Sequence, residues 1–208
     1  MYAPQHFQLD DPSLQRQLVQ AHPLALLVAS DARAARDAAA PPLALHLPMV
    51  WVDDGEQSWL EGHLARANPH LAGLAEGQTV RLVFTGPDAY VSPVHYDSPR
   101  NVPTWNYLAL EVLGTLHRVD EALAKDRLLK RLIEPRDPGY IAQWQGLPAD
   151  FQQSLLGAIV GLRVSVQSVQ AKAKLSQNRS AVERQRLIDH FDAGAAPAMA
   201  RWMRQLGL

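Results

Sequence analysis

The sequence contains no cysteine among its 208 residues, so it excludes disulfide bonds and thiolate chemistry. No apolar run approaches the roughly 18 residues that indicate a membrane-spanning helix. The amino terminus also lacks the basic region and the following apolar run that mark a signal peptide. Together these absences predict a cytoplasmic protein that has no membrane partner.

Net charge is also small, because 20 lysines and arginines face 21 aspartates and glutamates, which gives −1. A protein whose main surface binds nucleic acid is typically far more basic. One local basic cluster remains near the carboxyl end. Its members are Lys172, Lys174, Arg179, Arg184 and Arg186. The hydrophobic fraction of 47% and the charged fraction of 20% are those of an ordinary globular protein that can bury a sizeable core.

Several catalytic signatures are missing as well. There is no glycine-rich dinucleotide fingerprint and no phosphate loop. Ser92, His95 and Asp97 are close in sequence, but no nucleophile-elbow glycines surround the serine. The histidines have no acidic clusters at fixed spacing beside them, so we expect no metal site.

Hydrophobic periodicity and turn residues predict a mainly β fold with peripheral helices. We expect strands at residues 24–30, 43–52, 57–64, 79–85, 105–119 and 158–169, with a hairpin turn at 53–55 and a strand end at 86–88. We expect helices at residues 13–20, 68–74, 121–133, 150–156, 180–190 and 198–206. Residues 31–42 read as a loop, or as a helical turn over 32–36. A closed barrel would remove exposed strand edges, and no linker interrupts the chain, so we expect one domain, 1–208, with a helical carboxyl-terminal extension.

The most informative segment is residues 102–107, Val-Pro-Thr-Trp-Asn-Tyr. Pro103 restricts its own φ and favours an extended residue before it. Trp105, Asn106 and Tyr107 should therefore lie at the start of a strand, where an indole can stack on a flat ligand and an amide can recognise its edge. The alternative is a core tryptophan that begins a strand.

Four other segments accompany it in a fixed order. They are residues 1–7 (Met-Tyr-Ala-Pro-Gln-His-Phe), 62–70 (Gly-His-Leu-Ala-Arg-Ala-Asn-Pro-His), 86–93 (Gly-Pro-Asp-Ala-Tyr-Val-Ser-Pro) and 174–180 (Lys-Leu-Ser-Gln-Asn-Arg-Ser). In this order the motifs resemble the PaiB-like family of FMN-binding negative transcriptional regulators, over nearly the whole chain. The resemblance implies a split β-barrel that binds FMN, usually as a homodimer.

FMN has a doubly charged phosphate, a ribityl chain and a flat ring with polar edges. Arg66 and Asn68 lie where a predicted strand gives way to a helix, so a phosphate would meet a guanidinium and helix-terminal N–H groups there. By spacing alone, Arg66 reads as a solvated residue and Asn68 as a helix cap. The resemblance favours the phosphate.

Other candidates could reach the ring or the ribityl chain. Gly62 would let a ligand approach the backbone, and His63 beside it could reach a flavin edge. His46 lies on the neighbouring strand and could line the same cavity, although both histidines could be structural. Residues 174–179 could close over the flavin, contact DNA phosphates, or form a solvated face in which Glu183 pairs with an arginine. The cofactor-binding candidates are His46, Gly62, His63, Arg66, Asn68, Trp105, Asn106, Tyr107, Lys174, Ser176, Gln177, Asn178 and Arg179.

The chain departs from the family pattern at four places. His95 stands where an aromatic residue is expected, and Glu111 stands where a histidine is expected. Arg100 is the nearest cation to an expected lysine, and an aromatic residue expected near Ala173 is missing. The sequence thus favours an FMN-binding homodimer similar to PaiB-type regulators, with DNA as a weakly supported partner. The alternatives are a flavin-dependent oxidoreductase of the pyridoxamine-phosphate-oxidase-like class and a cofactor-free interaction module.

Overall fold

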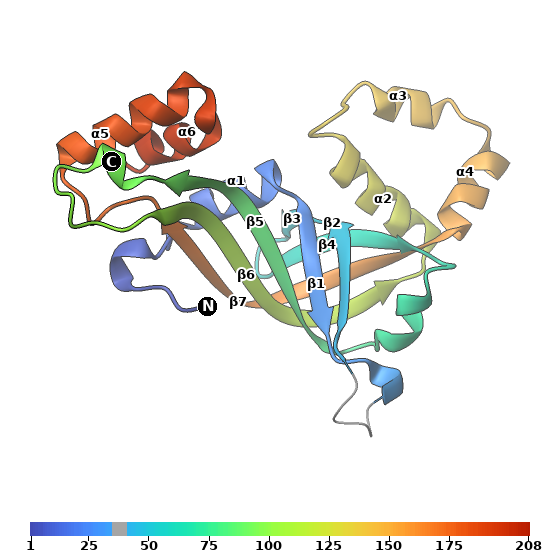
Figure 1. Ribbon diagram of the computed structural model, residues 1–208. Helices are drawn as coiled ribbons and strands as arrows, with labels where there is room; N and C mark the ends of the chain where they lie inside the picture. Colours follow the sequence, from blue (N-terminus) through green and yellow to red (C-terminus); the bar gives the residue numbers. More distant parts are fainter. Residues whose placement is uncertain (35–40) are drawn as a thin grey trace. The chain divides into compact units, whose positions relative to one another are not determined.

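The computed structural model describes residues 1–34 and 41–208. Its seven strands form one sheet in the order β2-β1-β5-β6-β7-β4-β3 (Figure 1). The strands are β1 (Leu24–Ala29), β2 (Leu43–Pro48), β3 (Val50–Asp53), β4 (Ser58–Ala65), β5 (Thr79–Val91), β6 (Thr104–Val119) and β7 (Ile159–Lys174). The mainly β fold with peripheral helices is confirmed.

Six α-helices and five short helical turns complete the described chain. The helices are α1 (Pro12–Ala21), α2 (Ala122–Ile133), α3 (Tyr140–Gln145), α4 (Ala149–Gly157), α5 (Ala181–His190) and α6 (Pro197–Gln205). The short turns are η1 (Gln5–Phe7), η2 (Ala32–Ala34), η3 (Pro69–Gly73), η4 (Pro93–His95) and η5 (Phe191–Ala195). The helical turn considered over 32–36 is thus present at its start, and residues 35–40 lie outside the described part. None of the described helices is long and apolar enough to cross a membrane.

The described chain divides into two compact units. Unit 1 consists of Met1–Gln15, Thr85–Leu110 and Gln170–Leu208, and unit 2 consists of Arg16–Phe84 and Glu111–Val169. The long strands β5, β6 and β7 each contribute one part to each unit. The expectation of a single domain over 1–208 stays a prediction.

In unit 2 the sheet curls until its two edges approach. β2 and β3 stand at opposite ends of the strand order, although Met49 alone separates them in sequence. The strand expected at residues 43–52 is therefore wrong as one strand, because its first half pairs with β1 and its second half pairs with β4. The hairpin turn at 53–55 is confirmed, with Asp54 N donating to Gln57 O at 3.1 Å and Gly55 in the left-handed region at φ 95°.

The core of unit 2 comes from alternating strand positions, as a half-buried sheet requires. Leu27, Leu60, Leu82, Val112 and Leu162 are fully buried. A Cβ on Gly114 of β6 would collide with the backbone oxygen of Ser165. Glycine at this position therefore permits a close approach of the neighbouring strands β6 and β7.

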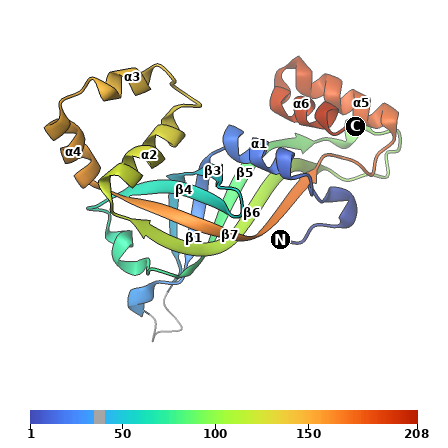
Figure 2. The ribbon, with the colours of Figure 1, turned by 180° about the vertical axis from the view of Figure 1, so that it is seen from behind.

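The helices α2, α3 and α4 follow one another in unit 2 (Figure 2). α2 begins as expected, because the Glu121 carboxylate accepts bonds from Leu123 N at 2.8 Å and Ala124 N at 2.6 Å. Leu128 is its most deeply buried leucine. α4 was expected, whereas the six-residue α3 was not. α3 follows the Asp137-Pro138-Gly139 breaker and is too short to show periodicity.

Two further boundaries differ from expectation. β5 continues through Gly86, Pro87 and Asp88, where we expected it to end. β1 pairs with residues 81–83 of β5, so Pro87 lies beyond that pairing and its missing N–H removes no bond to β1. The helix expected at 68–74 is a shorter 3₁₀ turn, η3. It ends at Gly73, and Asn68 caps it as its spacing suggested.

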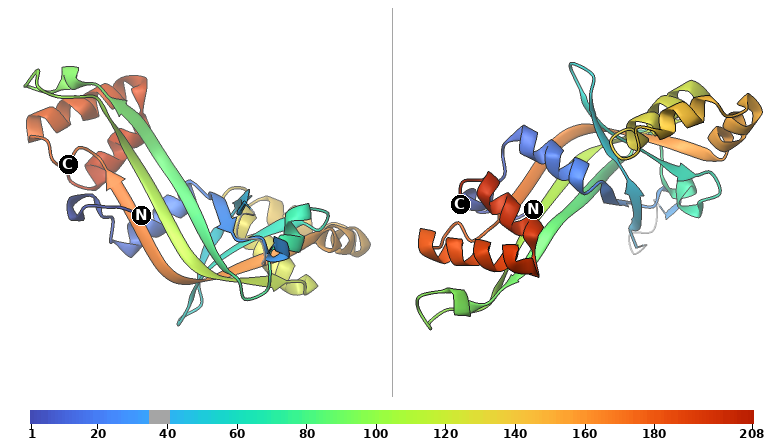
Figure 3. Two further views of the ribbon diagram at one scale, coloured as in Figure 1. Left: turned by 60° about the horizontal axis from the view of Figure 1, so that its bottom comes forward. Right: turned by 90° about the horizontal axis from the view of Figure 1, so that it is seen from above.

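Unit 1 combines strand ends with the two terminal segments. The amino-terminal segment attaches to β7 through a bridge between Gln8 and Lys172. α5 and α6 lie side by side and join at η5, where Gly194 has φ 121° (Figure 3). The pairing of Glu183 with an arginine is wrong. Glu183 instead forms a capping box with Ser180 and accepts a bond from Asp97 N at 3.0 Å.

Candidate functional site

The thirteen cofactor-binding candidates fall into two groups, which we describe separately. Five belong to unit 2 and eight to unit 1. A cavity of about 270 Å³ in unit 1 brings together five of its eight candidates. The lining residues are His6, Phe7, Tyr96, Val102, Thr104, Asn106, Lys174, Ser176, Asn178 and Arg179. We call this the unit 1 cavity.

Asn106 is the central polar residue of the unit 1 cavity. The residue is fully buried, because β6 alternates and directs Asn106 inward between its outward neighbours. Its Oδ1 accepts a bond from Ser176 Oγ at 3.0 Å, whereas its Nδ2 has no partner in the part of the chain that the structure describes. A buried donor without a partner costs about 1–3 kcal/mol, so a ligand acceptor at this point would recover that free energy.

Lys174 supplies positive charge to the same cavity. Its Nζ donates to Trp105 O at 2.7 Å and to Thr104 Oγ1. Burial lowers the pKa of Lys174, and the nearby charges of Lys172 and Arg179 lower it further. The ammonium group is therefore in a place that an anion would stabilise.

The loop after β7 holds the remaining donors. Ser176 is buried and has φ 64°, the single non-glycine residue with positive φ in the described chain. Such a conformation costs about 1–3 kcal/mol and is concentrated at functional sites. Arg179 lies over the Tyr96 ring at 3.8 Å and donates to Asn101 Oδ1 at 2.8 Å, so its guanidinium is held in place.

Three unit 1 candidates do not line the cavity. Trp105 is 52% exposed and meets the Tyr90 ring edge-on at 5.9 Å. Tyr107 lies beneath Lys172 Nζ, 5.2 Å from the ring centre. The Gln177 side chain braces the loop, because its Oε1 accepts a bond from Leu175 N at 2.7 Å. The strand position predicted for Trp105 is correct, but its indole lies on the opposite face of β6 from Asn106.

In unit 2, Arg66 and Asn68 contact the chain itself. Arg66 donates to Gly157 O at 2.9 Å and to Asp120 Oδ1 at 2.8 Å, and its side chain is half exposed. Asn68 Oδ1 accepts a bond from His70 N at 2.9 Å, as the helix-cap reading expected. Both residues lie at the predicted junction between a strand and a helical turn.

Gly62, His63 and His46 separate in space. A Cβ on Gly62 would meet the Met49 Sδ and Pro48 O at 2.5 Å, so the chain's own packing requires this glycine. His63 lines a second cavity, and its Nδ1 is buried without a partner among the described residues. Burial lowers the pKa of His63. His46 is exposed and is not among the residues that line this cavity, so the shared cavity expected for the two histidines is not formed there.

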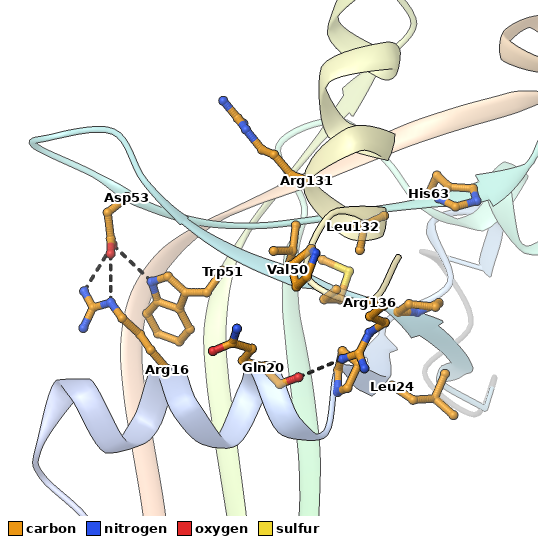
Figure 4. A pocket seen from close by; sticks show the side chains of 14 residues that line it. Arg16, Gln20, Leu24, Val50, Trp51, Asp53, His63, Arg131, Leu132 and Arg136 are labelled. Carbon is orange, nitrogen blue, oxygen red and sulfur yellow. Dashed lines mark hydrogen bonds and ion pairs between the residues drawn. The ribbon is translucent and has the colours of Figure 1, made fainter. Parts of the chain in front are cut away.

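Sequence reasoning missed this second cavity, which has a volume of about 640 Å³ and lies in unit 2 (Figure 4). Arg16, Trp51 and Asp53 meet at one side of it. No periodic signal pointed to it, because its residues come from α1, β3 and α2, which are distant in sequence. In unit 1, Thr104 lines the cavity but was not among the candidates, although it lies within the segment 102–107.

Two departures from the family pattern now have structural partners. His95 packs against His190 with ring centres 4.5 Å apart. Burial lowers the pKa of His95, and the charge of His190 adds to this effect. Glu111 pairs with Arg81. Among residues 1–34 and 41–208, no group of three acidic, histidine or cysteine residues could hold a metal ion.

The model of the family described as "Putative FMN-binding domain" matches residues 1–168. The chain belongs to this family. It is an FMN-binding protein with a split-barrel fold, as the motifs indicated. Residues 169–208, which include Lys174 and Arg179, lie beyond the matched part.

Relatives and solved structures agree with this assignment. The "Protease synthase and sporulation protein PAI 2" of Bacillus subtilis is 30% identical, over 92% of this chain and 89% of the relative. An uncharacterized protein of Emericella nidulans is 26% identical, over 94% of this chain and 93% of its own length. The FAD and heme binding protein from Mycobacterium smegmatis superposes with a TM-score of 0.62 at 21% identity, over 86% of this chain and 78% of that one. The flavocytochrome Anf3 from Azotobacter vinelandii superposes with a TM-score of 0.59 at 16% identity, over 80% of this chain and 69% of that one. At these identities the structures establish the fold alone.

The donor set of the unit 1 cavity fits a part of FMN. Lys174 and Arg179 are cations that suit its phosphate, and the Asn106 Nδ2 is a donor that suits a phosphate or ring oxygen. Phe7 and Val102 add apolar surface. The volume of about 270 Å³ is just below the range of roughly 300–1,000 Å³ typical of pockets that enclose a whole ligand. The cavity is therefore suited to a portion of the cofactor.

Proposed function

We propose that the protein is a flavin-binding homodimer similar to PaiB-type regulators, and that the unit 1 cavity holds part of its FMN. The observation that carries this proposal is the buried Asn106, whose Nδ2 has no partner among the described residues. A structural asparagine in a core is normally satisfied by its own chain. An unsatisfied one that lines a cavity beside a partly buried lysine suits an acidic, acceptor-rich ligand.

Each residue has a role in this proposal. Lys174 and Arg179 bind the charged end of the cofactor, and Asn106 orients one of its oxygens. Ser176 holds the Asn106 amide through the Oγ–Oδ1 bond, which directs Nδ2 toward the cavity. FMN, when bound, supplies a ring that can accept and return electrons.

The unit 2 candidates form a second proposed set, which is an alternative to the unit 1 cavity because FMN has a single phosphate. Arg66 and Asn68 would offer a guanidinium and N–H groups to a phosphate, while His63 brings a buried ring nitrogen that lacks a partner. The contacts of Arg66 with Asp120 and Gly157 leave other guanidinium N–H groups for a ligand.

The homodimer is supported by apolar side chains on unit 1. Tyr90 and Trp105 are each 52% exposed and meet each other, and Val102 is 75% exposed. Exposed aromatic side chains that gather in one place are typical of interaction surfaces. The role in transcription is proposed from the similarity to the PAI 2 protein, and the cytoplasmic location stays a prediction.

The test begins with the absorbance spectrum and mass of the molecule that copurifies with the protein. FMN binding is then titrated by fluorescence for the parent, for Lys174→Gln and for the control Arg201→Gln. Gln at 174 keeps a hydrogen-bond donor but removes the charge, so we expect a loss of about 1.5–3 kcal/mol, the worth of a charge-assisted bond. Arg201 is exposed on α6, so its replacement should leave FMN affinity unchanged.

The outcomes separate the proposed function from its alternatives. Equal FMN affinity for all three proteins would remove the unit 1 cavity from the flavin site. A colourless protein that does not take up FMN would favour the cofactor-free module. Rapid reduction of bound flavin by NADH or NADPH, without salt-sensitive binding to a promoter fragment, would favour the oxidoreductase.

A further inference from the structure

The second cavity, in unit 2, has no assigned occupant. Its volume of about 640 Å³ is within the range of roughly 300–1,000 Å³ typical of small-molecule sites. β3, the carboxyl-terminal half of α1 and the end of α2 contribute most of its lining (Figure 4). His63 is the one flavin candidate among its lining residues.

The charges around this cavity are positive in sum. Arg16, Arg131 and Arg136 line it, and Asp53 is the one carboxylate among the lining residues, which gives three positive charges against one negative. Arg16 and Asp53 neutralise each other through two bonds, Nε to Oδ2 at 2.8 Å and Nη2 to Oδ1 at 3.1 Å. The Arg16 guanidinium and the Ser58 hydroxyl lower the pKa of Asp53 to about 2, so this carboxylate stays ionised and committed to its partners.

The remaining two arginines differ in their partners. Arg131 donates to the buried Glu61 at 2.8 Å, and Arg163 pairs with both Glu61 at 2.8 Å and Asp54 at 3.6 Å, so this group of four is neutral in sum. Arg136 donates its Nη2 to the backbone oxygen of Gln20 at 2.7 Å, which is a neutral partner. A guanidinium has five N–H donors, so Arg136 keeps both its charge and further donors beside the cavity.

The rest of the lining is apolar. Leu24, Val50 and Leu132 are among the lining residues labelled in Figure 4. Met49 also lines the cavity and is almost fully buried. Arg16 lies 5.3 Å from the centre of the Trp51 ring, which fixes the indole as one wall.

We propose that this cavity binds an amphipathic organic anion, a carboxylate or a phosphate carried on an aromatic or aliphatic body. Arg136 binds the anionic group, and Val50 and Leu132 contact the body. A simple inorganic ion would leave the apolar lining without a contact, and a neutral hydrophobe would leave the charge without one. This site is separate from the unit 1 cavity and shares no residue with it.

The experiment uses the full chain and three naphthalene probes, 1-naphthoate, 1-naphthyl phosphate and the neutral 1-naphthalenemethanol, followed by calorimetry. We expect at least one anion to bind about tenfold or more tightly than the neutral probe, as one charge-assisted bond requires. The preferred anion tells whether the natural ligand is a carboxylate or a phosphate. Equal affinity for all three probes, or no binding of either anion, overturns the proposal.

Two variants and a control locate the binding. Arg136→Gln should weaken binding of the anion about tenfold and leave the affinity for 1-naphthalenemethanol unchanged. Leu132→Glu should abolish anion binding, because it places a negative charge beside the anion. Arg127→Gln is the matched control, because Arg127 is an exposed residue of α2 that does not line this cavity. Circular dichroism and FMN affinity should match the parent in all three. Anion binding that survives both lining variants overturns the proposal.

FMN itself provides the last arm. Saturating FMN should not compete with 1-naphthoate, because the proposed flavin cavity is a different one. Competition at the FMN dissociation constant would show that this cavity is the flavin site and would overturn the assignment of a second ligand. FMN affinity lost in Lys174→Gln with unchanged naphthoate binding supports both proposals independently.

Discussion

Asn106→Leu tests whether the buried amide of β6 serves the ligand or the fold. Leucine has a similar size but no polar atom, so it removes the Nδ2 that has no partner among the described residues and also the acceptor of Ser176 Oγ. If Asn106 is a structural residue, its replacement should lower the free energy of unfolding substantially. If Asn106 serves the ligand, its replacement should leave the free energy of unfolding almost unchanged and weaken FMN binding.

The magnitudes follow from the two bonds involved. Removing an unsatisfied buried donor recovers about 1–3 kcal/mol, and leaving Ser176 Oγ without its acceptor costs a similar amount. The ligand-free variant should therefore unfold within about 1 kcal/mol of the parent, or be more stable. In the complex the lost bond to FMN is worth roughly 0.5–1.5 kcal/mol for a neutral acceptor and about 1.5–3 kcal/mol for a phosphate oxygen. Since about 1.4 kcal/mol is tenfold, the dissociation constant should rise by about 2- to 150-fold.

The assay pairs urea unfolding of the FMN-free protein with a fluorescence titration of FMN. Asn106→Asp is the companion variant, because it keeps the acceptor for Ser176 and places a carboxylate toward the cavity. It should weaken FMN more than leucine does. Stability lower by more than about 2 kcal/mol in Asn106→Leu, together with unaltered FMN affinity, would refute the reasoning and make Asn106 a structural residue.

Four further predictions use other parts of the molecule. Arg66→Ala should weaken FMN by roughly 1.5–3 kcal/mol, and unchanged affinity would remove Arg66 from the site. Burial lowers the pKa of Lys174, so between that pKa and 10.5 the unfolded chain binds more protons than the folded one. The free energy of unfolding of the ligand-free protein should therefore rise with pH in this range, while FMN affinity falls. Lys174→Arg should remove both effects. Light scattering should show a homodimer, and a monomer that still holds FMN would exclude it. The flavin-loaded protein should bind DNA weakly and with strong salt dependence, and tight sequence-specific binding at physiological salt would contradict this.

The helices were the best predicted elements, because their start signals are local. The helices expected at 121–133 and 180–190 begin where Glu121 and Ser180 cap them, and Asp11 accepts a bond from Ser13 N at the start of α1. The strand rich in β-branched and aromatic residues after Pro103 was also correct. These start signals depend only on residues that are close in the sequence.

The wrong boundaries share one cause, which is that strand ends depend on partners far away in sequence. Pro87 looked like the end of a strand, but it lies where β1 no longer pairs with β5, so the strand continues. Met49 gave no turn signal, yet the chain changes from one strand partner to another there. Gly62 was taken as room for a ligand, and Met49 fills that room.

The basic cluster near the carboxyl end shows why charge patterns need a structure. Lys172 is buried, and its Nζ donates to Tyr2 O at 3.2 Å. Arg184 donates to Arg179 O at 2.6 Å, and Arg186 pairs with Asp97 at 2.6 Å. A sequence shows five cations, whereas the fold commits several of them to contacts within unit 1. We therefore expect this cluster to bind a DNA backbone weakly.

Three energetically unfavourable features occur together in the unit 1 cavity. Asn106 has a buried donor without a described partner, Ser176 has a left-handed backbone, and burial and like charges destabilise the Lys174 ammonium. Each of the first two costs about 1–3 kcal/mol, and a fold selected only for stability would have little reason to gather them in one place. A ligand that is anionic and rich in acceptors would relieve the first and the third together. It would therefore bind the folded state in preference to the unfolded one and raise the unfolding temperature as its concentration increases. FMN meets both requirements, whereas a neutral sugar or an apolar molecule of the same size relieves at most one of them.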